Sequence, residues 1–187
     1  MPTATALPSV GQDVPCSCYA MNVPLRIRTS LVNLDFKGGI NVRVEAHPSE
    51  PFYKAVVLKV TGHRVEAEHP ELGRLTIEQD DSEVTPGSLL EVVSHFPPKL
   101  SATMFLSFTL TIERPPEADP CDEPIMPRAA RPLVLRTREP ARLLSTELTR
   151  FPPQGDFYRL ERPIKLVDPE SDVIIATIDK FPVRVGG

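Results

Sequence analysis

Residues 102–112 alternate one by one between apolar and small polar side chains. Every even position is apolar, and the odd positions are Thr or Ser except for Phe105. Because successive side chains of a β-strand point to opposite faces, this period of two predicts a long strand with one buried face. The same pattern recurs along most of the chain between Pro, Gly or Asp residues. We therefore expect an all-β protein, a single antiparallel β-sandwich or flattened β-barrel.

The apolar runs predict about nine to eleven strands between residues 25 and 185. Lys37, Gly38 and Gly39 are typical of a hairpin turn, and Gly62 is expected to end a strand. Residues 141–148 are the one segment that could form a short helix. Pro169 in the acidic run 168–172 predicts a turn between two strands. The predicted core includes Ile27, Val42, Val44, Val57, Ile77, Met104, Leu106, Phe108, Leu110, Leu135, Ile164, Ile174 and Ile178.

Proline punctuates the chain and suggests its organisation. Residues 1–20, rich in Pro, Thr, Ala and Ser, are expected to form a flexible arm with no secretory signal. Residues 21–187 are expected to form a single all-β domain. Residues 115–132 contain six prolines and several acidic residues, which predicts an exposed loop in which Ile125 and Met126 would be the apolar anchors. Phe-Pro pairs at 96–97, 151–152 and 181–182 predict loops whose Phe covers an open end of the core.

Charge and cysteine content exclude several classes of protein. The net charge of −4 gives no basic face for nucleic acid. No apolar run reaches the roughly 20 residues needed to span a bilayer. Three cysteines without framework spacing favour a reducing compartment, so we expect a cytoplasmic location. The oligomeric state stays open.

Four polar clusters are candidates for metal binding, and each has a simpler explanation. His63 and His69 share a strand face with Val65 and Ala67 but lie roughly 20 Å apart, too far for one metal; a solvated strand is favoured. Cys16 and Cys18 offer two soft ligands, and Cys121 and a His would have to complete a zinc site. The acidic runs 80–83 and 168–172 lack the ligand spacing of an EF-hand and favour surface turns. We expect no metal.

The sequence contains no nucleophile elbow and no phosphate-binding glycine pattern, so no cofactor is expected. The favoured hypothesis is therefore a non-catalytic binding or structural β-module, with a small apolar molecule or a protein as its partner. The alternative is a small-molecule cyclase or isomerase with an apolar barrel pocket, in bacterial natural-product biosynthesis. Such pockets leave no linear motif. The residue types that could serve in one are Tyr53, Glu91, His95 and Tyr158.

Several turn and strand-start segments resemble an uncharacterised family of small bacterial all-β proteins, a domain of unknown function. They run with gaps from residue 70 to residue 176, and the family has Asn-Lys where this chain has Thr137-Arg138. The resemblance implies an all-β fold and a bacterial origin, and it supplies no activity and no site residues. The segments are Pro70-Glu71-Leu72-Gly73, Leu75-Thr76-Ile77, Leu133-Val134-Leu135, Glu139-Pro140, Phe151-Pro152-Pro153, Tyr158-Arg159-Leu160, and Asp168-Pro169 followed by Ala176.

Overall fold

The computed structural model describes residues 7–51, 54–80, 87–95, 97–116 and 132–186. These residues form thirteen antiparallel strands and no helix, which confirms the all-β fold class. The strands are β1 (Asp13–Ile27), β2 (Ser30–Ala46), β3 (Ala55–His69), β4 (Gly73–Gln79), β5 (Ser88–His95), β6 (Pro98–Leu106), β7 (Phe108–Ile112), β8 (Leu133–Thr137), β9 (Ala141–Leu148), β10 (Asp156–Leu160), β11 (Ile164–Val167), β12 (Ile174–Ile178) and β13 (Val183–Val185).

The single sheet closes on itself twice. Its strand order is β12-β11-β8-β7-β4-β3-β2-β1-β13-β10-β9-β6-β5, with additional pairings between β12 and β1 and between β3 and β5. Pairing of β12 with β1 closes a first ring of β1, β2, β3, β4, β7, β8, β11 and β12. Pairing of β3 with β5 closes a second ring of β1, β2, β3, β5, β6, β9, β10 and β13. The protein is thus a flattened double barrel, and closure satisfies the strand edges.

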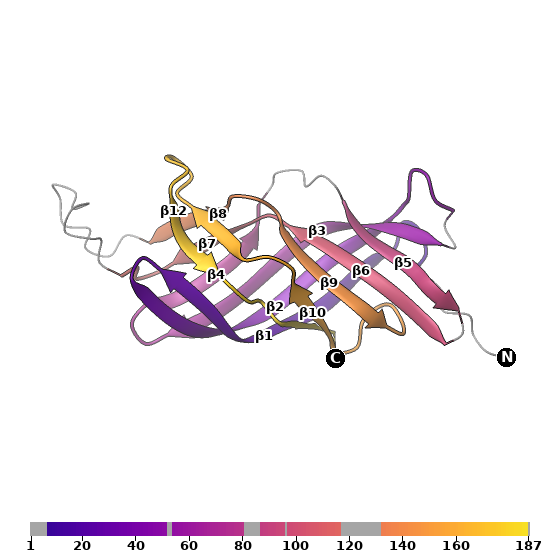
Figure 1. Ribbon diagram of the computed structural model, residues 1–187, viewed down its shortest axis with the longest axis horizontal. Coiled ribbons are helices and arrows are strands. Elements are labelled where there is room, and N and C mark those ends of the chain that lie inside the picture. Colours follow the sequence, from indigo (N-terminus) through magenta and orange to yellow (C-terminus); the bar gives the residue numbers. More distant parts are fainter. Residues whose placement is uncertain (1–6, 52–53, 81–86, 96, 117–131, 187) are drawn as a thin grey trace.

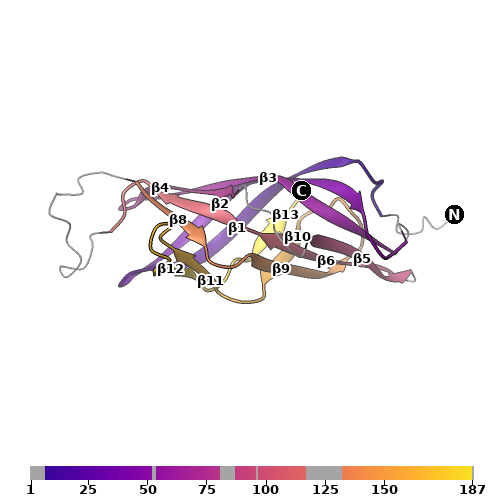
Figure 2. The same cartoon turned by 90° about the horizontal axis from the view of Figure 1, so that it is seen from above.

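The three longest strands, β1, β2 and β3, belong to both rings and run along the long axis of the molecule (Figure 1). Seen from above, β2 and β3 lie on one side, and β9, β6 and β11 face them from the other (Figure 2). β2 lies between β1 and β3, and each of these two strands pairs near one end with a strand of the first ring and near the other end with a strand of the second. The N-terminal half of β1, for example, pairs with β13, whereas Leu25–Ile27 pairs with β12.

The predicted hairpin at residues 37–39 is wrong, and so is the predicted strand end at Gly62. The chain reverses at Arg28 and Thr29 instead, and β2 runs straight through Gly38 and Gly39. Gly38 is required by a close approach rather than by a turn, because a Cβ there would overlap the carbonyl oxygen of Arg64 on β3. Gly62 likewise lies inside β3, next to a bulge.

The structure confirms the predicted buried face of the alternating segment 102–112. Its even residues, from Ala102 to Ile112, are all buried, and its odd residues are half-buried. The segment changes partners at Ser107: β6 pairs with β5 and β9 in the second ring, and β7 pairs with β4 and β8 in the first. Of the predicted core, Val57 is only half-buried and Ile174 is 42% exposed. The inward residues beside them are Val56, Leu58 and Ala176.

Two segment predictions are corrected. Residues 13–20, assigned to a flexible arm, form the first half of β1, with Val14, Cys18 and Ala20 buried; small side chains and Pro15 disguised the alternation. Residues 141–148, considered as a short helix, form β9 because they pair with β6 and β10. The arm's residues 1–6 and most of the Pro-rich loop, including Ile125 and Met126, lie outside the described residues.

The predicted turn at residues 168–172 is confirmed, and two of the Phe-Pro loops place their Phe against the core. Residues 168–172 join β11 to β12, and the Asp172 amide donates to the Asp168 carbonyl at 2.9 Å. Phe181 is buried and its ring lies 6.1 Å from that of Phe36, while Phe151 is half-buried against the core. Phe96 lies outside the described residues. Within the described part of the chain, no helix has the length and hydrophobicity needed to cross a membrane.

Candidate functional site

A cavity lies inside the second ring. It is lined by β1, β2, β3, β6, β9, β10 and β13, by the loop between β9 and β10, and by the loop between β12 and β13. The space between its walls is about 480 Å³ including the part open to solvent, but the centres of water molecules can occupy only about 30 Å³ of it. Its lining residues are Cys16, Cys18, Ile40, Val42, Leu58, His63, Met104, Leu106, Leu143, Phe151, Pro153, Tyr158, Phe181, Val183 and Val185.

One wall of the cavity is built by the shared strands. In the register of the sheet, Cys16 lies opposite Ile40, and Ile40 lies opposite His63, so these three side chains form one row across β1, β2 and β3. Cys18, two residues further along β1, points to the same side and lies opposite Gly38, beside which the β3 backbone at Arg64 approaches closely. The small side chains of Cys16 and Cys18 on this wall leave room that larger ones fill elsewhere.

A β-bulge directs His63 into the cavity. On β3 the buried residues nearest the bulge are Val56 and Leu58 before it and His63 and Val65 after it. Thr61 is skipped in the pairing with β2, so the extra residue moves the inward face from even to odd positions. The neighbouring Arg64 consequently points outward, where it forms ion pairs with Glu66 at 2.8 Å and with Glu78 at 2.6 Å.

His63 is the most unusual polar residue of the cavity. It is 6% exposed, and its Nδ1 atom is buried with no hydrogen-bond partner among the described residues. Burial lowers the pKa of His63 to about 4 from its ordinary 6.5, because removal from water disfavours the charged imidazolium. The imidazole is therefore neutral at pH 7, with one N–H donor and one acceptor nitrogen.

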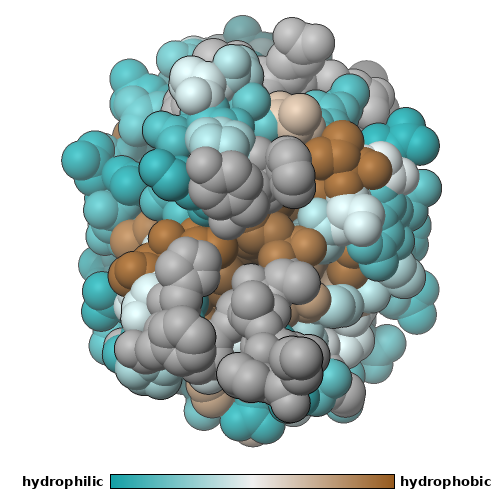
Figure 3. Space-filling view, turned by 90° about the vertical axis from the view of Figure 1, so that its right-hand side faces the viewer, coloured by the Kyte–Doolittle hydropathy of each residue, from teal (hydrophilic) through white to brown (hydrophobic). Residues whose placement is uncertain are grey.

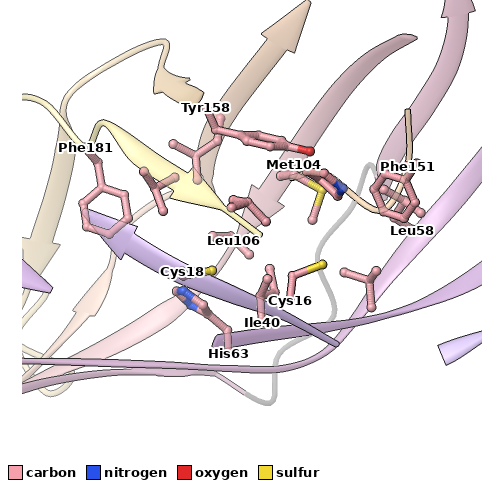
Figure 4. A pocket seen from close by; sticks show the side chains of 15 residues that line it. Cys16, Cys18, Ile40, Leu58, His63, Met104, Leu106, Phe151, Tyr158 and Phe181 are labelled. Atoms are coloured by element: carbon pink, nitrogen blue, oxygen red, sulfur yellow. The ribbon is translucent and has the colours of Figure 1, made fainter. Parts of the chain in front are cut away.

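The other polar groups of the cavity are also neutral. Burial raises the pKa of the Cys16 thiol, and burial together with the neighbouring Cys16 raises that of Cys18 to about 12. The pKa of Tyr158 is raised, first by burial and then by nearby Cys16 and Asp156. Tyr158 lies across the cavity from Cys16 and Cys18 (Figure 4). Since neither cysteine is disulfide-bonded, both thiols face the cavity in their reduced, protonated form.

The ends of the cavity are covered by loop aromatics. Phe151 and Phe181 lie toward opposite ends of it in Figure 4. The Gly186 amide donates to the Ser17 carbonyl at 2.8 Å, and a Cβ at Gly186 would overlap the Pro153 carbonyl, so the end of β13 lies tightly against this loop. At the end of the molecule shown in Figure 3, hydrophobic surface gathers in the centre and hydrophilic side chains surround it.

Two of the four residues that the sequence singled out have side chains among those that the structure describes. Tyr158 lines the cavity, whereas Glu91 is exposed on β5. Tyr53 lies outside the described residues, as does the side chain of His95, whose backbone ends β5. Among the described residues, no group of three or more His, Cys, Asp or Glu side chains could hold a metal ion.

Sequence reasoning missed Cys16, Cys18 and His63 as cavity residues. It correctly placed His63 on the face of Val65 and Ala67, but the favoured interpretation was a solvated strand; that face is buried, and His69 is half-buried. For the cysteines a signal was present: Val14, Cys16, Cys18 and Ala20 alternate with polar residues and Pro15. A thiol counts as a small apolar side chain, so this stretch has the period of a strand.

Comparison with known proteins identifies a structural relative. No family model matches the chain, and no curated protein matches it. A solved structure, that of DynF from the dynemicin biosynthesis pathway of Micromonospora chersina, has a TM-score of 0.69 and 16% sequence identity. The match covers 100% of this chain and 84% of that one. The likeness establishes a shared fold over the whole chain.

Proposed function

We propose that this protein binds a small apolar molecule in the cavity of the second ring and acts as a barrel protein of a bacterial natural-product pathway. The observation that carries the proposal is the cavity itself, whose walls are almost entirely apolar. Ligand pockets in proteins are mostly apolar with a few polar groups, and this cavity has that composition. The pathway assignment is supported by the shared fold with DynF, a protein of dynemicin biosynthesis.

The polar side chains in the cavity favour binding over a purely structural core. A buried polar group without a hydrogen bond costs roughly 1–3 kcal/mol, which a filled apolar core would avoid. His63 carries such a group and touches the cavity. A ligand that contacts the imidazole would recover this cost, whereas a structural role gives no reason for a histidine at this position.

Binding requires the cavity to enlarge. In the present conformation the cavity has room for roughly two water molecules. A typical ligand site has a volume of roughly 300 Å³ or more. Two lining residues can yield: Phe151 lies in the loop between β9 and β10 and is only half-buried, and Met104 has a flexible, unbranched side chain. We therefore expect a ligand to displace Phe151 from the cavity.

The second candidate function is a small-molecule cyclase or isomerase with the same cavity as its active site. It is favoured by two neutral proton-carrying groups, Tyr158 and His63, on facing walls. General acid–base catalysis uses such groups within hydrogen-bond reach of the reacting atoms. The two candidates differ in one measurement, because an enzyme converts the bound molecule and a binding protein returns it unchanged. Membership of the uncharacterised bacterial family stays a further prediction.

Tryptophan reporters test the proposal. The chain contains no Trp, so a single substitution creates a unique fluorophore. We would compare Phe151→Trp, in the cavity lining, with Phe157→Trp, whose side chain is 58% exposed on β10. Titration with the uncharged apolar probe N-phenyl-1-naphthylamine should change the tryptophan emission of Phe151→Trp, because excitation energy passes to the bound probe and the probe displaces the indole from the cavity. This change should saturate as the probe concentration rises. The Phe157→Trp protein should show a smaller spectral shift at the same probe occupancy.

A blocking variant supplies the negative control. Val42→Phe adds volume to the cavity wall, while Val134→Phe makes the same change at a residue that is 44% exposed in the first ring. Val42→Phe should abolish probe binding, and Val134→Phe should leave it unchanged. Equal binding by both variants would place the probe elsewhere and refute the proposal. Native mass spectrometry of the purified protein, with and without Val42→Phe, would then identify any co-purified molecule and show whether it is converted.

A further inference from the structure

We infer that the ligand of this cavity is uncharged and carries one hydrogen-bonding group, a hydroxyl or a carbonyl, that pairs with His63. This inference rests on the proposed function, because it specifies the chemical class of the molecule that the cavity binds. It follows from the position of His63, from its missing hydrogen bond, and from the absence of charge in the cavity lining.

His63 marks the end of the cavity that is nearer to the first ring. Along β3, residues 55–58 pair with β5 of the second ring, and Arg64 already pairs with β4 of the first ring. His63 lies five positions beyond Leu58, which corresponds to roughly 15 Å along a strand. A molecule lying along the cavity would therefore contact apolar side chains over most of its length and meet the imidazole at one end.

The imidazole lacks a partner that a ligand could supply. No described group hydrogen-bonds to Nδ1, although the side chain is more than nine-tenths buried. A neutral imidazole both donates and accepts, so either a hydroxyl or a carbonyl can satisfy it. Cys18 and His63 both line the cavity. A thiol is a weak donor and a poor substitute for such a group.

The cavity has no means of neutralising a charged ligand. None of its lining residues is Asp, Glu, Lys or Arg. The titratable groups that face the cavity are Cys16 and Cys18 from β1, His63 from β3 and Tyr158 from β10, and all are uncharged at pH 7. Transfer of an unpaired carboxylate or ammonium from water into such surroundings is strongly unfavourable. The cavity therefore disfavours binding of a charged ligand and favours binding of a neutral ligand with a polar group.

Three probes of one shape separate these contributions: naphthalene, 2-naphthol and 2-naphthoate. Each would compete with N-phenyl-1-naphthylamine at pH 7.5 in the unmodified protein, in His63→Leu and in His63→Gln. We expect 2-naphthol to bind more tightly than naphthalene in the unmodified protein, and 2-naphthoate to bind at least about tenfold more weakly than 2-naphthol. In His63→Leu, the preference for 2-naphthol over naphthalene should fall by about tenfold, and His63→Gln should restore part of it.

The outcomes separate the inference from the proposed function. Binding of naphthalene with no preference for 2-naphthol, or a preference that His63→Leu leaves unchanged, would overturn the inference and leave the proposed function standing. Tightest binding of 2-naphthoate, strengthening as the pH falls from 7.5 to 5.5, would also overturn it, because His63 would then act as a cation. Failure of all probes to bind, including N-phenyl-1-naphthylamine, would overturn both.

Discussion

The buried His63 should make the stability of the protein depend on pH, and the dependence can be calculated. In the unfolded chain the imidazole has its ordinary pKa of 6.5, and in the folded protein burial lowers that pKa to about 4. Between these two pH values the unfolded state binds more protons than the native state, so stability rises with pH across this window and falls on acidification. At 1.36 kcal/mol per pKa unit, the full loss is about 3 kcal/mol, of which about 2 kcal/mol has occurred by pH 5.

The assay is urea unfolding at pH 7.5 and pH 5 for the unmodified protein and for His63→Leu. Other groups also titrate in this range, so the informative quantity is the difference between the two proteins in their loss of unfolding free energy. We expect the unmodified protein to lose about 2 kcal/mol more than His63→Leu. Leu31→Ala is the control, because Leu31 is 59% exposed and its substitution removes no titratable group. Equal losses in the unmodified protein and His63→Leu would refute the burial of a neutral imidazole.

Three other predictions follow from the fold. Phe108→Ala should lower the free energy of unfolding by about 3–5 kcal/mol, because the Phe108 side chain is only 1% exposed. Leu31→Ala, at a residue that is 59% exposed, should change it by less than about 0.5 kcal/mol. Urea unfolding measures both, and equal losses would contradict the position of Phe108 in the core. Gly38→Ala should reduce the melting temperature measured by circular dichroism, because the new Cβ would overlap the Arg64 carbonyl oxygen. Gly62→Ala should reduce it less, because the nearest atom to its Cβ, on Asn41, is 4.0 Å away. Burial raises the pKa of both Cys16 and Cys18, so few of these thiols are ionised and reactive at pH 8. The folded Cys121→Ser protein should therefore react with iodoacetamide at least about tenfold more slowly than the same protein unfolded in urea. Mass spectrometry measures the labelling, and fast labelling of the folded protein would contradict the burial of the two thiols.

Side-chain size differs between the two rings. In the first ring, bulky aliphatic residues such as Leu75, Ile77, Leu110 and Ile112 are fully buried and lie opposite one another on β4 and β7. In the second ring, the cavity wall on β1 carries the small side chains of Cys16 and Cys18. Substitution of large by small side chains in a closed barrel leaves space that the surrounding sheet cannot collapse to fill. The cavity is thus a consequence of side-chain size on a common scaffold.

The period-two pattern by itself determined the fold class and most of the strands. Alternation is a local property, because each side chain's face follows from its position along its own strand. The even residues of 102–112 could therefore be assigned to the core without knowledge of any partner strand, and all of them are buried. The turn at residues 168–172 was equally local, because Asp and Pro favour a turn wherever they occur.

The tertiary structure alone decided which glycines are turns, where the long strands continue, and what lies in the cavity. Gly38 reads as a turn residue in the sequence, but its role is to let the β3 backbone approach, and that neighbour comes from 26 positions further along the chain. His63 faces inward only because a bulge at Thr61 shifts the pairing with β2, and a bulge is a relation between two strands that no single strand encodes. Cys16 and Tyr158 meet across a space that exists because β3 and β5 close the second ring. Residues distant in sequence become neighbours only through that closure, which is why the candidate site could not be found from local pattern.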